Sequence, residues 1–473
     1  MNSDIAGEPA DATAAQLVEA YRSGTLSPSE ALESVLARIA DCEPRLRATY
    51  ARDPDGARTA AAEATERWRR GEPLGPVDGV PVTLKENIAT RGVPVPSGTA
   101  ATELVPAPRD APAAARLREG GAVITTKTTM PDFGMLGSSV SSFHPRTANP
   151  WNERRTPGGS SSGAGAAAAA GYGPLHLGTD IGGSVRQPAH CCGLVGLKPS
   201  NGRIPVVPPY YGRAIGPLTR TVEDATLLRR GVSAPDARDH TSLPPADLDF
   251  DAVARADESR LRGVRIGVMT ECGVGFAVEP DIAAAVDAAA RRFAAAGAIV
   301  EPVGPLLHRE MLDGLDRFWR ARAWADVSAL PPARAEKVLP EILRWARSGQ
   351  ELTGEQVFHG FSQMDAMARA AATMWCSVDY LLTPTAPIPA FGVEQAFSSD
   401  DGERPFEHIG FTVPFNMSGQ PAVSVNCGWT GDGLPIGLQI VGPRFDDVGI
   451  LALARLHELM SPPPRPWPTF SVP

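Results

Sequence analysis

Two short segments rich in glycine and serine carry the hydroxyl groups that could do chemistry in this chain. Residues 157–163 read Pro-Gly-Gly-Ser-Ser-Ser-Gly, and residues 178–186 read Gly-Thr-Asp-Ile-Gly-Gly-Ser-Val-Arg. Because glycine lacks a Cβ, backbone N–H groups in such turns can approach a ligand closely. A serine beside several converging N–H groups suits acyl transfer, in which the amides stabilise the oxyanion. The flanking segments are apolar, which argues against a pair of flexible surface loops.

Two other chemistries fit these turns less well. Residues 159–163 formally match G-x-S-x-G, the nucleophile elbow of α/β-hydrolases. That elbow needs a strand directly before it, and the segment 149–157, which contains two prolines, cannot be a central strand. Phosphate binding is disfavoured because the chain has neither a G-x-x-x-x-G-K-[ST] loop nor a G-x-G-x-x-G motif after a strand. A serine nucleophile activated by lysine remains.

Lys85 is the best candidate for such a base. A lysine base must be neutral at working pH, although its pKa in water is about 10.4. Burial behind apolar residues can lower that pKa by several units, and Lys85 ends the apolar segment 80–84. The S-x-x-K spacing of penicillin-recognising enzymes is absent, because valine stands three residues before both Lys85 and Lys198. The chain has only four lysines: Lys85, Lys127, Lys198 and Lys337.

The elements around the two turns would hold them in place. The first turn is predicted to open an alanine-rich helix that ends at Gly171, and Ser160 could serve only as the N-cap of that helix. A buried strand over 175–179 leads to the second turn, where a short helix is predicted to begin at 182–184. Upstream, a strand over 79–85, a helix over 111–119 and a strand over 122–126 indicate a parallel sheet.

The rest of the chain extends this pattern to one large α/β domain around a mixed sheet. A long irregular loop is expected over 130–157, and long loops are often functional. The region 305–375 is helical and rich in tryptophan and arginine, which suits a lid or substrate-binding insert. The further predicted helices span 14–22, 27–40, 53–70, 221–230, 281–296 and 447–460, and the further strands 264–269, 298–303, 380–385, 423–427 and 434–441.

Composition narrows the functional classes. The net charge of −9 without a basic block argues against nucleic acid as the main partner. The N-terminus lacks an apolar signal region and no run of about 18 apolar residues occurs, so we expect no membrane partner. Six scattered cysteines without a CxxC motif favour a reduced, cytoplasmic protein. The eight histidines form no HxH or HxxxH pair, so we expect no metal and no cofactor.

The ordered motifs resemble the amidase signature family, the Ser–cisSer–Lys amide hydrolases. The resemblance covers essentially the whole chain, with weaker agreement over 232–262 and 305–375. It departs from the usual pattern at residues 162–164, where Ser-Gly-Ala follows the second serine. The motifs that carry it are residues 78–87, 149–151, 157–163, 178–186, 193–199, 411–416 and 434–442.

The resemblance implies a fold and a set of residue roles. The fold is one domain over residues 1–473, with a twisted mixed sheet flanked by helices on both faces. Its parts would be N-terminal helices over 1–70, a catalytic core over 78–230 and the helical insert. Ser184 would be the nucleophile, Ser160 the bridging serine in a cis peptide and Lys85 the general base. The remaining implied site residues are Ile181, Gly182 and Gly183 in the oxyanion hole, Ser161, Asp180 and Arg186 in support, and Phe133 and Gly134 in the pocket.

These observations favour an amidase that hydrolyses a small-molecule amide to an acid and ammonia or an amine through a serine acyl-enzyme. An amidotransferase A-type subunit, which frees ammonia from glutamine for a partner, is the alternative. A catalytically silent scaffold of the same fold is a third. Six aromatic residues of the insert hint at an aryl or apolar acyl group, or form only lid core: Phe318, Trp319, Trp324, Trp345, Phe358 and Phe361. The substrate, a homodimeric state and the need for a partner protein are left open.

Overall fold

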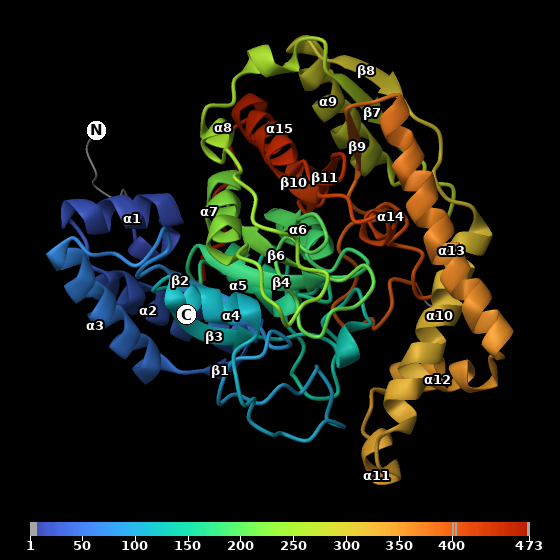
Figure 1. The fold of residues 1–473 in the computed structure, drawn as a ribbon, viewed down its shortest axis with the longest axis horizontal. Coiled ribbons are helices and arrows are strands. Elements are labelled where there is room, and N and C mark those ends of the chain that lie inside the picture. Colours follow the sequence, from blue (N-terminus) through green and yellow to red (C-terminus); the bar gives the residue numbers. More distant parts are fainter. Residues whose placement is uncertain (1–6, 400–401, 403, 471–473) are drawn as a thin grey trace.

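A mixed β-sheet of eleven strands runs through the described part of the molecule. The computed structural model describes residues 7–399, 402 and 404–470. The strand order is β1-β3-β2-β4-β6-β5-β10-β11-β9-β7-β8, from one end of the molecule to the other (Figure 1). The strands are β1 Thr49–Arg52, β2 Pro81–Lys85, β3 Val123–Thr128, β4 Leu175–Asp180, β5 Val195–Lys198, β6 Ala214–Thr219, β7 Arg265–Val268, β8 Ile299–Pro302, β9 Tyr380–Pro384, β10 Ala422–Trp429 and β11 Pro435–Val441.

Parallel strands lie toward both ends of the sheet, and antiparallel strands form its middle. β3, β2 and β4 are parallel neighbours, and so are β9, β7 and β8. Every pair from β4 through β6, β5, β10 and β11 to β9 is antiparallel. Helix α4 (Pro112–Glu119) connects β2 to β3, and α9 (Pro280–Ala295) connects β7 to β8. Both predicted strand–helix–strand units are therefore confirmed, as is the mixed α/β fold class.

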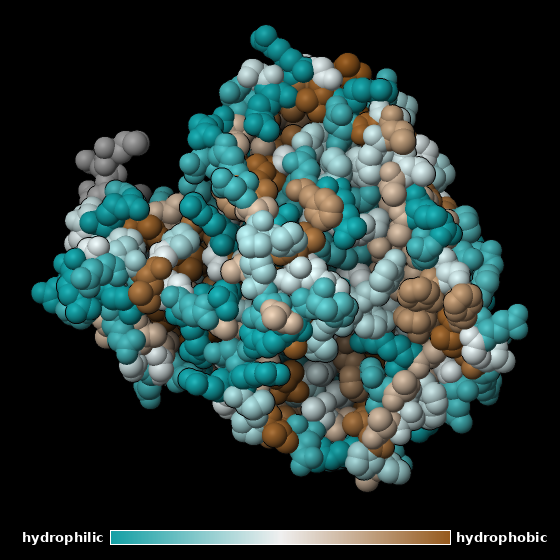
Figure 2. Space-filling model, viewed as in Figure 1, coloured by the Kyte–Doolittle hydropathy of each residue, from teal (hydrophilic) through white to brown (hydrophobic). Residues whose placement is uncertain are grey.

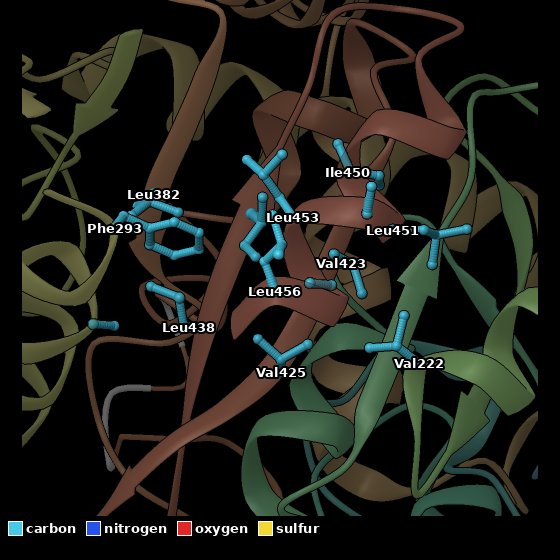
Figure 3. Packing of buried hydrophobic residues seen from close by; sticks show 14 of the residues in the cluster. Val222, Phe293, Leu382, Val423, Val425, Leu438, Ile450, Leu451, Leu453 and Leu456 are labelled. Atoms are coloured by element: carbon cyan, nitrogen blue, oxygen red, sulfur yellow. The ribbon is translucent and has the colours of Figure 1, made fainter. Parts of the chain in front are cut away.

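Helices cover both faces of the sheet. α5 (Ser162–Ala170) and α6 (Arg186–Cys192) pack on one face, and α7 (Val222–Val232), α9 and α15 (Asp447–Met460) pack on the other. Side chains alternate between the faces along a strand. In β10, Val423 and Val425 point into the cluster that contains Phe293 and Leu453 (Figure 3), whereas the Ser424 hydroxyl bonds to Thr385. Full burial of such apolar side chains contributes about 1.5–3 kcal/mol each.

The three N-terminal helices begin at the predicted caps. The side chains of Thr13, Ser27 and Asp53 accept backbone N–H bonds at the starts of α1 (Ala14–Ser23), α2 (Pro28–Leu46) and α3 (Pro54–Arg70). Thr13 and Ser27 also complete reciprocal capping boxes. The predicted end of α2 at residue 40 is wrong, because the helix continues to Leu46. Cys42 and Leu46 are fully buried in a cluster with α5, and that packing extends the helix.

Three strands and one helix start differ from the prediction. β1, β5 and β6 were not predicted. A glycine in β5, and a glycine and a proline in β6, locally disfavour a strand. In β6 the glycine reflects close packing, because a Cβ on Gly216 would lie 1.9 Å from the carbonyl oxygen of Leu197 in β5. The short helix predicted to begin at 182–184 is α6, which begins only at Arg186. The backbone of Gly183, with φ of 120°, is not helical there.

The predicted helical region 305–375 forms a layer beside the sheet. It consists of α10 (Arg309–Ser328), α11 (Pro332–Ala335), α12 (Pro340–Arg347) and α13 (Gly354–Thr373), with α10 packed along α13 (Figure 1). Trp319 and Trp345 are buried against Phe406 and Ile409, on the segment that leads into α14 (Val413–Met417). The viewed face is mostly hydrophilic, with scattered apolar side chains (Figure 2). Among the described residues, no helix combines the length and apolarity needed to cross a membrane.

Candidate active site

Lys85 lies fully buried at the end of β2, with its amine against two serine hydroxyls of the first turn. Its Nζ donates to Ser160 Oγ at 2.8 Å and to Ser161 Oγ at 3.1 Å. No carboxylate forms an ion pair with Lys85 among residues 7–399, 402 and 404–470. Burial, followed by the nearby charge of Arg213, lowers the pKa of Lys85 well below its usual value. The lowered pKa favours the neutral amine, the form that a base requires.

Two other lysines are also buried, but neither hydrogen-bonds to a serine within the described residues. Burial lowers the pKa of Lys127 and of Lys198 to about 7. Lys127 Nζ donates to the carbonyl oxygen of Ile88 and to Thr90 Oγ1. Lys198 Nζ donates to the carbonyl oxygen of Pro199 at 2.8 Å and to Asn201 at 3.3 Å. The contacts with two serine hydroxyls, rather than burial, distinguish Lys85.

Ser160 lies in the first turn, directly before α5. It is 3% exposed, and its peptide bond with Gly159 is cis. The alternative that Ser160 caps α5 is wrong, because the helix begins at Ser162 and Ser161 occupies the N-cap position without a side-chain cap bond. Ser161 instead accepts from Lys85, and its Oγ donates to the carbonyl oxygen of Thr179 at 3.2 Å. The first turn is thus tied both to β2 and to β4.

Asp180 organises the second turn. Its carboxylate accepts the backbone N–H groups of Gly183 at 2.9 Å and Val185 at 3.0 Å. It also pairs with Arg186 at 2.9 Å and accepts from Asn416 at 2.8 Å, and both charged side chains are fully buried. Burial alone would raise the pKa of Asp180, but the Arg186 charge and these hydrogen bonds hold it well below its usual range. The turn is therefore fixed around a buried anion.

The amides expected to form the oxyanion hole fall into two groups. The Gly183 N–H is engaged by Asp180. The N–H groups of Ile181, Gly182 and Ser184 have no hydrogen-bond partner within the described part of the chain. The Gly182 carbonyl accepts from Thr412 Oγ1 at 2.6 Å, which orients the peptide that carries the Gly183 N–H. Three amides thus remain available for an anionic oxygen at this turn.

Ser184 lies where two pockets meet. Ser184, Ile181, Gly134, Met135 and Arg322 line both of them. The first pocket is mainly apolar, and its remaining lining includes Leu136, Trp319, Phe406 and Ile409. The second pocket is more polar and includes Asn87, Phe133, Ser160, Tyr210, Arg213 and Asp326.

The structure brings the residues from distant parts of the sequence together at this junction. The Ser161 N–H donates to the carbonyl oxygen of Ser184 at 3.2 Å, so the two turns are in direct contact. Gly134 lies beside the first turn, because a Cβ there would be 3.2 Å from Ser160 Oγ. Phe133 faces only the second pocket. Both residues predicted for a pocket wall therefore lie at a pocket beside Ser184.

Sequence reasoning missed several residues of the site. Thr412 and Asn416, which hold the second turn, lie in the motif 411–416 that carried the resemblance, so a signal for them existed. Arg213, Phe406 and His408 gave no signal. Of the six aromatic residues of the insert, Trp319 alone lines the first pocket, and Phe358 is 72% exposed on α13. Among the described residues, no group of three or more histidine, cysteine or acidic side chains could hold a metal.

A sequence model of the family described as Amidase matches residues 30–451 of this chain. The chain belongs to the amidase signature family. The match confirms the resemblance inferred from the ordered motifs, and it makes the protein an amide hydrolase of that class. Both turns and Lys85 lie inside the matched range.

Curated relatives and solved structures agree with this assignment. The A-type subunit of the glutamyl-tRNA(Gln) amidotransferase from Chloroflexus aggregans is 34% identical over 93% of this chain and 94% of its own length. The structure of a bacterial aryl acylamidase of the amidase signature family has a TM-score of 0.87 at 30% identity, covering 95% of this chain and 96% of that one. A 6-aminohexanoate cyclic dimer hydrolase complexed with substrate also has a TM-score of 0.87, at 28% identity and 98% and 100% coverage.

Proposed function

We propose that this amidase signature enzyme hydrolyses a carboxylic amide to an acid and an amine or ammonia, through an acyl-enzyme on Ser184. The observation that carries the proposal is the buried Lys85, whose Nζ donates to Ser160 and Ser161 beside the Ser184 turn and whose lowered pKa favours the neutral amine. Lysine in this state can accept a proton, and Ser160 can pass one, since a hydroxyl both donates and accepts. Both Ser160 and Ser184 line the second pocket, where the amide would lie.

The reaction would proceed in two halves. Ser184 Oγ attacks the amide carbonyl carbon, and its proton moves through Ser160 to Lys85. The C–N bond then breaks, and Lys85 returns the proton through Ser160 to the leaving nitrogen. In the second half, water attacks the ester, its proton travels the same way, and Ser184 recovers its proton as the acid leaves. Each amide of the 181–184 turn that binds the oxyanion would contribute about 3–4 kcal/mol in the transition state.

The chemistry can be tested with a fluorophosphonate probe, which labels an activated serine. We expect labelling of Ser184, loss of the label in Ser184→Ala, and strong slowing in Lys85→Ala. Ser162→Ala is the matched control, because its hydroxyl is buried in the first turn but donates to the carbonyl oxygen of Ser138. Label on another serine, or full labelling of Ser184→Ala, would contradict the assignment of the nucleophile.

An amidotransferase A-type role is the second candidate, and the curated relatives at 32–34% identity favour it. Against it, the first pocket presents Trp319, Phe406 and Ile409, an apolar lining that suits an aryl or alkyl group better than glutamine. Incubating the isolated chain with aryl, alkyl and amino-acid amides separates the two roles. Hydrolysis of an aryl or alkyl amide without a partner supports the free-standing amidase. Glutaminase activity that needs an added partner would support the alternative.

A further inference from the structure

Arg213 places a positive charge in the second pocket without an opposing carboxylate. Its Nη1 donates to the carbonyl oxygen of Pro208 at 3.3 Å, and no ion pair forms at Arg213 within the described residues. Arg213 lines the pocket that holds Ser160 and Ser184. Burial, followed by the nearby charge of Arg322, lowers the pKa of Arg213 to about 10. An anion beside Arg213 would relieve that electrostatic cost.

The other charged groups that line the second pocket are already compensated. Arg322 lies 3.8 Å from Asp326 and stacks over the Tyr210 ring at 4.4 Å. Asp180 is paired with Arg186. Arg213 therefore leaves the second pocket with an unbalanced positive charge, and a ligand can supply the missing anion.

The position of Ser160 decides which half of the substrate enters each pocket. In the proposed cycle, the leaving nitrogen must face Ser160 to receive a proton. Ser160 lines the second pocket and is absent from the lining of the first. The amine half of the substrate therefore extends into the second pocket, toward Arg213. The acyl half enters the first pocket, against Trp319 and Phe406.

We propose that Arg213 is a specificity-determining residue that binds a carboxylate on the amine half of the substrate. The substrate class would be an N-acyl amino acid with an apolar acyl group. This inference rests on the proposed amide hydrolysis. The C–N bond between the acyl carbon and the amino acid nitrogen breaks, the nitrogen takes the proton from Lys85, and water supplies the oxygen of the released acid. The bound carboxylate stays unchanged throughout. Arginine suits this task because its planar guanidinium can donate two parallel hydrogen bonds to a carboxylate.

Matched benzamides test the inference. N-Benzoylglycine carries the carboxylate, N-propylbenzamide is its neutral counterpart, and N-(2-aminoethyl)benzamide carries a positive charge instead. The measured quantity is the ratio of kcat/KM between the charged and the neutral substrate. This ratio cancels any effect of Arg213 on Lys85, because such an effect acts equally on both substrates. Hydrolysis of the neutral substrate also reports that each variant is folded.

We expect the wild-type enzyme to prefer N-benzoylglycine over N-propylbenzamide by about ten-fold or more, the range of one charge-assisted hydrogen bond. Arg213→Gln should abolish that preference, Arg213→Lys should restore part of it, and Arg213→Glu should favour the aminoethyl substrate. Arg369→Gln is the matched control, since Arg369 pairs with Asp365 on α13 and does not line the second pocket.

The outcomes separate this inference from the proposed function. Hydrolysis of N-propylbenzamide with no preference for N-benzoylglycine, or with a preference that Arg213→Gln leaves intact, overturns the inference alone. The same holds if Arg213→Gln selectively slows succinamate, which carries its carboxylate on the acyl half. If no amide is hydrolysed and Ser184 is not labelled by the fluorophosphonate, the proposed function fails and the inference fails with it.

Discussion

Replacing Asp180 with asparagine removes the anion around which the second turn is built. The wild-type carboxylate accepts from the Gly183 and Val185 amides, from Arg186 and from Asn416. An asparagine has nearly the same shape but only one acceptor oxygen and no charge. Arg186 would remain fully buried without its counter-ion, although its Nη1 still donates to Gln439 Oε1 at 2.7 Å.

The size of the effect follows from this burial. Removing one partner of a buried ion pair costs about 3–5 kcal/mol, because the other charge is left uncompensated. Such a loss is a large part of the roughly 5–15 kcal/mol that stabilises a typical folded domain. The Gly183 amide would also lose its acceptor, which frees the turn that carries Ser184. Misplacing one oxyanion donor costs about 100-fold to 1,000-fold in kcat.

Asp78→Asn provides the control for a purely structural effect. Asp78 is fully buried and pairs with Arg67 at 2.6 Å, far from Ser184 in the sequence and outside both pockets. We expect both variants to lower the free energy of unfolding in urea. Only Asp180→Asn should lower kcat of the folded fraction about 100-fold or more. Equal kcat values in the two variants would refute the role of Asp180 in positioning the turn.

The pH dependence of the free energy of unfolding gives a second test of the same prediction. The pKa of Asp180 is depressed in the folded state, so its stabilisation is complete above the unfolded value of about 3.9. The stabilisation is lost as pH falls through the folded pKa. The difference in unfolding free energy between wild type and Asp180→Asn should therefore be constant from about pH 7 to about pH 5 and narrow in stronger acid. A difference that grows in acid would contradict the assigned direction.

Further predictions concern the base, the turn and the first pocket. Because Lys85 must be neutral to act as the base, kcat/KM should rise with pH on the acidic side of the profile, at a position set by the lowered pKa of Lys85. A rate maximum near pH ~5 would count against lysine as the base. Lys85→Ala should lower kcat about 100-fold to 10,000-fold. Gly183→Ala should reduce kcat, because the new Cβ would lie 2.5 Å from Thr412 Oγ1 and residue 183 has a φ of 120°. Gly24→Ala is the control and should leave kcat unchanged, because no atom lies within 4 Å of a Cβ at that position. Trp319→Ala should raise KM for an aryl amide about ten-fold through lost apolar contact, and Phe358→Ala, at an exposed position, should not change KM.

Local chemistry explains why many elements could be predicted from the sequence. The caps at Thr13, Ser27 and Asp53 act within four residues of the chain, so the helix starts they mark were predicted correctly. The apolar alternation that ends at Lys85 likewise marks β2. The glycine and the proline in β6 locally disfavour a strand. Only the close approach of Leu197 in the neighbouring strand explains the glycine, Gly216.

The candidate catalytic residues also divide into features that the local sequence predicts and features that only the tertiary structure explains. The position of Lys85 and the two glycine–serine turns were enough to predict a serine–lysine chemistry, because a lysine at the end of a buried strand can be neutral and glycine turns can expose amides. The roles of Ser160 and Ser184 were predicted from the resemblance to the family. The sequence likewise determined the family, through motifs that follow one another along the chain. The predicted chemistry and the family assignment both rest on the kinds of residues present and on their local order.

The tertiary structure decided what those residues face. It placed Lys85 within hydrogen-bond distance of Ser160, 75 residues away in sequence, and brought Thr412 and Asn416 onto the second turn. It also put Arg213 and Trp319 into separate pockets that both include Ser184. Contacts of this kind form when β2, β4 and β6 pair across the sheet and the insert packs beside them. Sequence spacing determines the register within one strand or helix, whereas the packing of distant elements determines which side chains line a pocket.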